Sequence, residues 1–178
     1  MILACLLCLL ADPISLVEGR SAVESYRWPG NSVQFYLGDV PPSRDGAGFH
    51  REAVRAFGEW HRRTGMRFTR VYQRGLPGTV DVIFGDDELS PLAGQLAHTY
   101  LPPPNPEPRA GDIYVSVTER TAVNGDPDLY SVLLHEIGHA LGLQHLPEGV
   151  MRGYYQQNYR LLAPDLEAWG RLYQRTNQ

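Results

Sequence analysis

Three histidines and a glutamate occur at a spacing that suits a metal-dependent hydrolase. Residues 134–145 read LHEIGHALGLQH, which fits the pattern H-E-x-x-H-x-x-G-x-x-H. On a helix, residues four apart lie one turn above each other on one face, so His135 and His139 can share one metal ion. Glu136 lies beside a ligand without being one, which would place its carboxylate next to a metal-bound water.

Gly142 explains how a third histidine can join this pair. It has no Cβ, so it can end the helix in the left-handed conformation that other residues avoid. The chain can then double back and bring His145 to the same ion. Three protein ligands and one open position are typical of catalytic zinc, whereas structural zinc sites have four protein ligands. The alternative is an amphipathic core helix that carries these histidines by chance.

The composition indicates a globular protein with a single folded domain. The chain has 178 residues, of which 43% are hydrophobic and 20% charged, and these values are ordinary for a soluble domain. The net charge of −4 comes without a stripe of Lys and Arg, so we expect no nucleic-acid partner. We also expect a monomer.

The first 19 residues are interpreted as a signal peptide or an apolar N-terminal segment. Residues 1–11, MILACLLCLLA, are too short for a membrane span, which needs about 20 apolar residues. They resemble the apolar core of a secretory signal peptide, although no positive charge precedes them. The sequence thus favours a secreted protein, with a misassigned start or an apolar tail as the alternative. Residues 20–31 are read as a linker or short pro-segment, and residues 32–178 as the domain.

Periodic patterns predict the elements that must position the motif. Alternating apolar residues predict strands at 32–37 and 66–71, and a more continuous apolar run predicts a buried strand at 79–84. Apolar steps of three and four predict a helix over 48–64. Two short strands are expected at 95–101 and 113–117. A helix over about 127–141, capped by Asp126, carries the motif, and a last helix begins near residue 164.

An acidic turn precedes the fourth predicted strand. Gly85 is followed by Asp86, Asp87 and Glu88, whose carboxylate oxygens are of the type that binds calcium. Their spacing matches no calcium-loop pattern, which favours a solvated acidic loop. Calcium therefore stays an alternative here.

With Met151 in a turn after the third histidine, the chain resembles the metzincin clan of zinc peptidases. Within that clan it is similar to the matrixins, the catalytic domains of matrix metalloproteinases. LAHTY at 96–100 resembles their cleft-edge strand, MRGYY at 151–155 resembles their Met-turn and wall segment, and Asp165 falls in a stretch like their C-terminal helix. The resemblance implies an α+β fold, with a mixed, mostly parallel twisted sheet, a backing helix, an active-site helix and a C-terminal helix.

The resemblance also implies roles for the motif residues. His135, His139 and His145 would ligate one catalytic zinc ion. Glu136 would be the general base and acid of peptide-bond hydrolysis. Met151 would form the hydrophobic floor beneath the metal.

Other residues are implied in binding a protein or peptide substrate. Ala97 and His98, in the cleft-edge strand, would pair with an extended peptide that adds to the sheet. Gly153 and Tyr155 would line the wall of the pocket for the side chain just after the cut bond. Ser131 lies one turn before the first histidine, and so small a residue would leave that pocket open for large apolar side chains.

The chain departs from the family at its further metal sites. Matrixins usually hold a second, structural zinc with three histidines and an aspartate. Only His98 has a counterpart here, because residues 112–115, DIYV, contain no histidine where one is expected. Most of the acids expected for calcium before Ile113 are also missing. We therefore expect one zinc ion and regard calcium as the weaker expectation.

The sequence favours a zinc-dependent endopeptidase over two alternatives. One is a non-catalytic module that binds zinc and peptide. The intact Glu136 argues against it, because loss of catalysis would release that position first. The other is a zinc hydrolase of small molecules, and the predicted edge strand favours an extended peptide instead.

Overall fold

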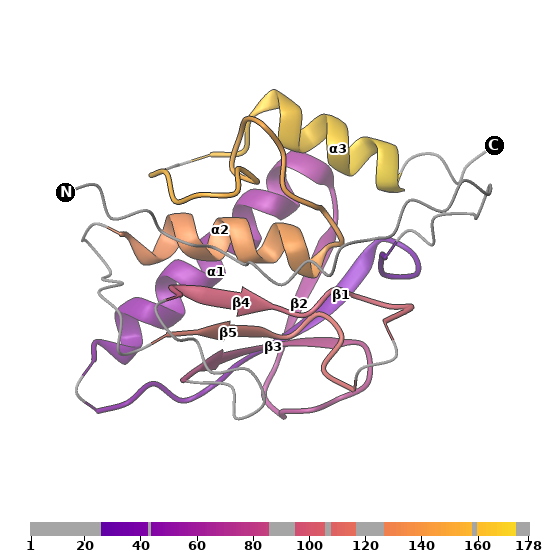
Figure 1. Ribbon diagram of the computed structural model, residues 1–178. Coiled ribbons are helices and arrows are strands. Elements are labelled where there is room, and N and C mark those ends of the chain that lie inside the picture. The colour runs from indigo at the N-terminus through magenta and orange to yellow at the C-terminus, as the bar shows by residue number, and fades with distance from the viewer. Residues whose placement is uncertain are drawn as a thin grey trace.

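A five-stranded sheet with helices over one face forms the framework of the protein (Figure 1). The computed structural model describes residues 26–42, 44–85, 95–105, 108–116, 127–157 and 160–173. The elements of this part of the chain are β1 (Ser32–Leu37), α1 (Gly46–Thr64), β2 (Arg67–Val71), β3 (Thr79–Phe84), β4 (Ala97–Thr99), β5 (Ile113–Val115), α2 (Leu129–Ala140) and α3 (Ala163–Tyr173).

The sheet is mixed and mostly parallel, as the resemblance implied. Its strand order is β2-β1-β3-β5-β4, and only the pairing of β4 with β5 is antiparallel. The central strand β3 is almost wholly buried, which explains its continuous apolar sequence. Strand β4 lies at an edge, and its outer side pairs with no other strand among the described residues. That edge lies next to α2 in Figure 1.

Helix α1 connects the sheet to the helix that carries the motif. Its apolar stripe packs on the sheet, where the ring of Phe57 stacks on Phe35 of β1 with centroids 4.2 Å apart. The buried indole of Trp60 donates a hydrogen bond of 3.0 Å to the backbone carbonyl of Leu134 in α2. Helix α1 is therefore the backing helix that the resemblance implied.

Helix α2 is almost completely enclosed, since eleven of its twelve residues are buried. Its N-cap is Asp128, whose carboxylate accepts a hydrogen bond of 2.9 Å from the backbone N–H of Ser131. The expected cap at Asp126 is therefore wrong, and the helix begins two residues later. Two candidate aspartates lie close together in the sequence, and the one that reaches a free N–H of the first turn is the cap.

The described chain before β1 also contributes to the core. Trp28 lies within the segment 20–31 that was expected to be a linker or pro-segment, and its side chain is buried. Its indole N–H donates a 2.7 Å hydrogen bond to the carbonyl of Ala140 at the end of α2. Tyr173 of α3 donates a 2.8 Å hydrogen bond to the next carbonyl, that of Leu141. None of the helices described in this structure is both long and apolar enough to cross a bilayer.

Candidate metal centre

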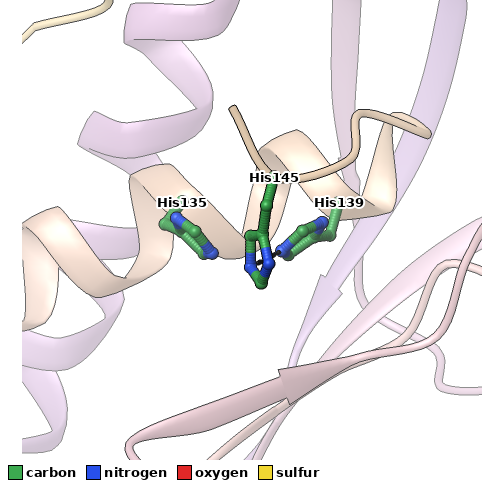
Figure 2. Close-up of side chains that lie close together, drawn as sticks. All are labelled: His135, His139 and His145. Carbon is green, nitrogen blue, oxygen red and sulfur yellow. Dashed lines mark hydrogen bonds between the residues drawn. The ribbon is translucent and has the colours of Figure 1, made fainter. Parts of the chain in front are cut away.

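The three histidines of the motif converge on one point (Figure 2). His135 and His139 project from successive turns of α2, and His145 reaches them from the loop that follows. Their candidate ligand atoms all lie within 4.8 Å of one another, and Nε2 of His139 is 3.2 Å from Nε2 of His145. Nitrogens bound to a tetrahedral zinc at 2.0–2.1 Å would be about 3.3 Å apart. The arrangement therefore fits a zinc site.

Backbone carbonyls fix the orientation of two of the rings. Nδ1 of His135 lies 2.7 Å from the carbonyl oxygen of Val150, and Nδ1 of His139 lies 2.7 Å from that of Leu143. Because a carbonyl only accepts hydrogen bonds, each Nδ1 carries the proton and each Nε2 keeps a free lone pair. Nε2 of His135 is buried and has no hydrogen-bond partner in the described structure, which a metal ion would explain.

The surroundings of the histidines also favour metal binding. Burial lowers the pKa of His135, His139 and His145 below the usual value. The pKa of His139 is lowered furthest, first by burial and then by the two neighbouring histidines. The rings are therefore neutral near pH 7, and the neutral form is the one that ligates metals.

A Schellman turn after α2 places the third histidine. The N–H of Leu143 bonds to the carbonyl of Gly138 at 3.0 Å, and the N–H of Gly142 bonds to that of His139 at 2.8 Å. Gly142 has a φ of +94°, and a Cβ there would lie within 1.8 Å of the carbonyl oxygen of Tyr26. The turn predicted at this glycine is confirmed, and it also carries the Leu143 carbonyl back to the His139 ring.

Met151 lies directly beneath the histidine helix. It is fully buried, and a Cβ on Gly138, which lies between the two helical histidines, would come within 2.1 Å of its sulfur. The carboxylate of Asp165 accepts hydrogen bonds of 3.0 Å from the N–H groups of both Val150 and Met151. Asp165 thus fixes the turn whose Val150 carbonyl orients His135. The sequence placed Asp165 in the C-terminal helix but gave no sign of this anchoring role.

Glu136 is enclosed between α2 and the edge strand. Its side chain is 2% exposed, and the hydroxyl of Thr99 in β4 donates a 2.5 Å hydrogen bond to its Oε2. Burial raises the pKa of the Glu136 carboxyl to about 7, and the bond from Thr99 only partly offsets that rise. Sequence reasoning did not identify Thr99, because a threonine at a strand end carries no signal of its partner.

The edge strand presents the other substrate-binding candidates. Ala97 is buried, whereas the half-buried ring of His98 packs edge-on against Tyr100 with centroids 4.9 Å apart. Tyr114 of β5 stands opposite His98 in the strand register.

In the described ranges, the three motif histidines are the one group of three or more His, Cys, Asp or Glu side chains suited to hold a metal ion. The acidic turn at 86–88 lies outside those ranges, so calcium there stays a prediction.

A small cavity adjoins the first histidine. It is lined by Ser131, Val132, His135, Val150, Tyr154, Tyr155 and Gln156, and its volume is about 10 Å³, about enough for one water. The hydroxyl of Tyr155 donates a 2.9 Å hydrogen bond to the Asp128 carboxylate. The same hydroxyl accepts a 3.0 Å hydrogen bond from the backbone N–H of Asp128. Among the described residues this cavity is small, and Tyr155 in its wall is tied to the start of α2, so the open pocket suggested by the small Ser131 stays a prediction.

Gly153 lies next to the third histidine. A Cβ on this residue would lie 3.4 Å from Nδ1 of His145, so its backbone lies against that ring. It is not among the residues that line the cavity. Within the wall segment at 151–155, Gly153 therefore lies next to the third histidine, and its role in the substrate pocket stays a prediction.

Comparison with known proteins identifies relatives of the whole folded region. A family model described as Matrixin matches residues 27–174. Matrix metalloproteinase-16 of Rattus norvegicus is 29% identical over 176 residues, which cover 86% of this chain and 28% of that protein. Macrophage metalloelastase of the same species is 27% identical over 165 residues, which cover 86% of this chain and 35% of that protein. Karilysin of Tannerella forsythia is 29% identical over 165 residues, which cover 85% of this chain and 34% of that protein. The chain thus spans about a third or less of these relatives.

Proposed function

Because this chain belongs to the matrixin family, we propose that it is a zinc-dependent endopeptidase that hydrolyses peptide bonds in proteins. The observation that carries the proposal is the convergence of His135, His139 and His145 beside the buried carboxyl of Glu136. Relatives named metalloproteinase and metalloelastase support the same activity. The three histidines would hold one zinc ion, with Met151 beneath it.

The chemistry divides between the metal and the glutamate. Zinc, when bound, supplies a water of lowered pKa and a positive charge that stabilises the developing oxyanion. Glu136 takes the proton from the attacking water and returns it to the departing amine. A carboxyl whose pKa lies near 7 can both accept and release a proton at neutral pH.

The edge strand favours an extended peptide as the substrate. The outer edge of β4, the strand that holds Ala97 and His98, pairs with no other described strand, so an extended peptide can add to the sheet there. A hydrolase of small molecules has no need of such an edge. Export of the protein rests on residues 1–11, which lie outside the described residues, and remains a proposal.

The cavity beside His135 would receive the side chain that follows the cut bond. Because its volume is about 10 Å³, we expect small side chains there to be preferred over those of Phe or Leu. Peptides that differ only at this position should show kcat/KM values about tenfold higher for Ala than for Phe. A preference for Phe would mean that the Tyr155 wall moves aside, and would restore the interpretation drawn from Ser131.

Removal of the metal tests the proposed function as a whole. The purified chain is expected to contain one zinc, and dialysis against a zinc chelator should lower cleavage of a quenched fluorescent peptide at least tenfold. Stoichiometric zinc should restore the activity, whereas magnesium should not, since histidine nitrogens suit zinc. One zinc per chain without cleavage of a diverse peptide set would instead favour the non-catalytic zinc- and peptide-binding module.

A further inference from the structure

Thr99 links the edge strand to the buried glutamate. It is the last residue of β4, and its Oγ1 lies 2.5 Å from Oε2 of Glu136 and 3.4 Å from the Glu136 backbone carbonyl oxygen. A threonine hydroxyl has a single hydrogen to donate. The shorter distance assigns that hydrogen to the carboxylate.

This bond restricts a side chain that otherwise has considerable freedom. A glutamate side chain reaches its carboxyl group through several rotatable bonds, and the last torsion is broad. A donor fixed on Oε2 holds that torsion and leaves Oε1 to exchange a proton. Thr99 itself is held by the sheet, because it lies opposite Ile113 in the register and the next residue, Tyr100, donates a 3.0 Å backbone hydrogen bond to the carbonyl of Asp112.

We propose that Thr99 is a positioning residue, whose hydroxyl holds the carboxyl of Glu136 in the orientation needed for proton transfer. This inference rests on the proposed function. Because β4 is also the strand on which an extended peptide would pair, one rigid element aligns both the substrate and the base. Misplacement of a catalytic group by about 1 Å can cost up to 10²-fold in rate. Loss of the hydroxyl should therefore cost less than loss of the base.

Thr99→Val is the sharpest variant, because valine keeps the β-branched shape of threonine and removes the hydroxyl. We expect kcat to fall about tenfold with KM changed less than twofold, and the zinc content to stay at one per chain. Thr99→Ser, which retains the donor, should recover most of the lost kcat. Thr79→Val is the matched control, since this buried threonine of β3 lies away from the site and should leave kcat unchanged.

Two further measurements distinguish a loss of Glu136 orientation from an unspecific loss of active-site structure. In a Glu136→Gln background, Thr99→Val should change the residual rate little, because the group that it positions is gone. Crystal structures of the wild type and Thr99→Val should show the Glu136 carboxyl displaced or in several rotamers only in the variant.

An unchanged Glu136 carboxyl in the Thr99→Val crystal would overturn the positioning role even if the wild type proved inactive. So would wild-type kcat in Thr99→Val, or equal losses in the Ser and Val variants. Inactivity of the zinc-loaded wild type contradicts the proposed function instead. The two failures are therefore distinguishable.

Discussion

Glu136→Gln is expected to lower kcat by about 10³-fold while the protein keeps one zinc per chain. General acid–base catalysis typically contributes about 10²- to 10⁴-fold, and an amide cannot take the proton of the attacking water. The amide oxygen of glutamine can still accept the hydrogen bond from Thr99, so the local geometry should survive. The substitution also removes a buried ionisable group, and folding stability should not fall.

Cleavage of a quenched fluorescent peptide, zinc content and thermal unfolding should be measured together for this variant. Glu167→Gln provides the control, because this carboxylate is exposed on α3 and its side chain is 71% accessible. If Glu136→Gln still cleaves the peptide with zinc bound, the assignment of Glu136 as the general base is wrong. Loss of zinc along with activity would mean that the carboxyl supports the metal site itself.

The motif was predictable because its geometry is local. The four-residue step that joins His135 to His139 follows from helical periodicity, and the positive φ of Gly142 follows from the need to reverse the chain. The strands were predictable for the same reason, since alternation and continuous apolar runs reflect burial along one segment. The mixed sheet order required the family resemblance.

The contacts between distant segments could not be predicted from local patterns. Thr99 meets Glu136 across 37 residues, and Tyr155 meets Asp128 across 27, so each contact depends on how separate elements pack. The second contact bears on the pocket that the small Ser131 suggested, because Tyr155 lines the same cavity as Ser131. Nothing in the residues near position 131 indicates this contact.

Asp165→Ala is expected to destabilise the protein by at least about 2 kcal/mol. The carboxylate is fully buried and accepts hydrogen bonds from the buried N–H groups of Val150 and Met151 and from the partly buried N–H of Leu162. Each of the two buried donors left without an acceptor costs about 1–3 kcal/mol. For a domain of this size, that loss corresponds to a fall in Tm of roughly 4–8 °C or more. Glu167→Ala on the same helix should leave Tm nearly unchanged, and a Tm for Asp165→Ala equal to that control would contradict the anchoring role.

Asp165→Asn then distinguishes fold stability from control of the metal site. The amide keeps one acceptor oxygen, but its NH₂ group must face at least one of the three N–H donors, so the loss should be smaller than for alanine. At a temperature where this variant stays folded, we expect faster loss of zinc to a chelator than in the wild type. The reason is that Asp165 holds the Val150 N–H, and the Val150 carbonyl in turn orients the His135 ring. Unchanged zinc release in a destabilised Asp165→Asn would confine the role of Asp165 to folding.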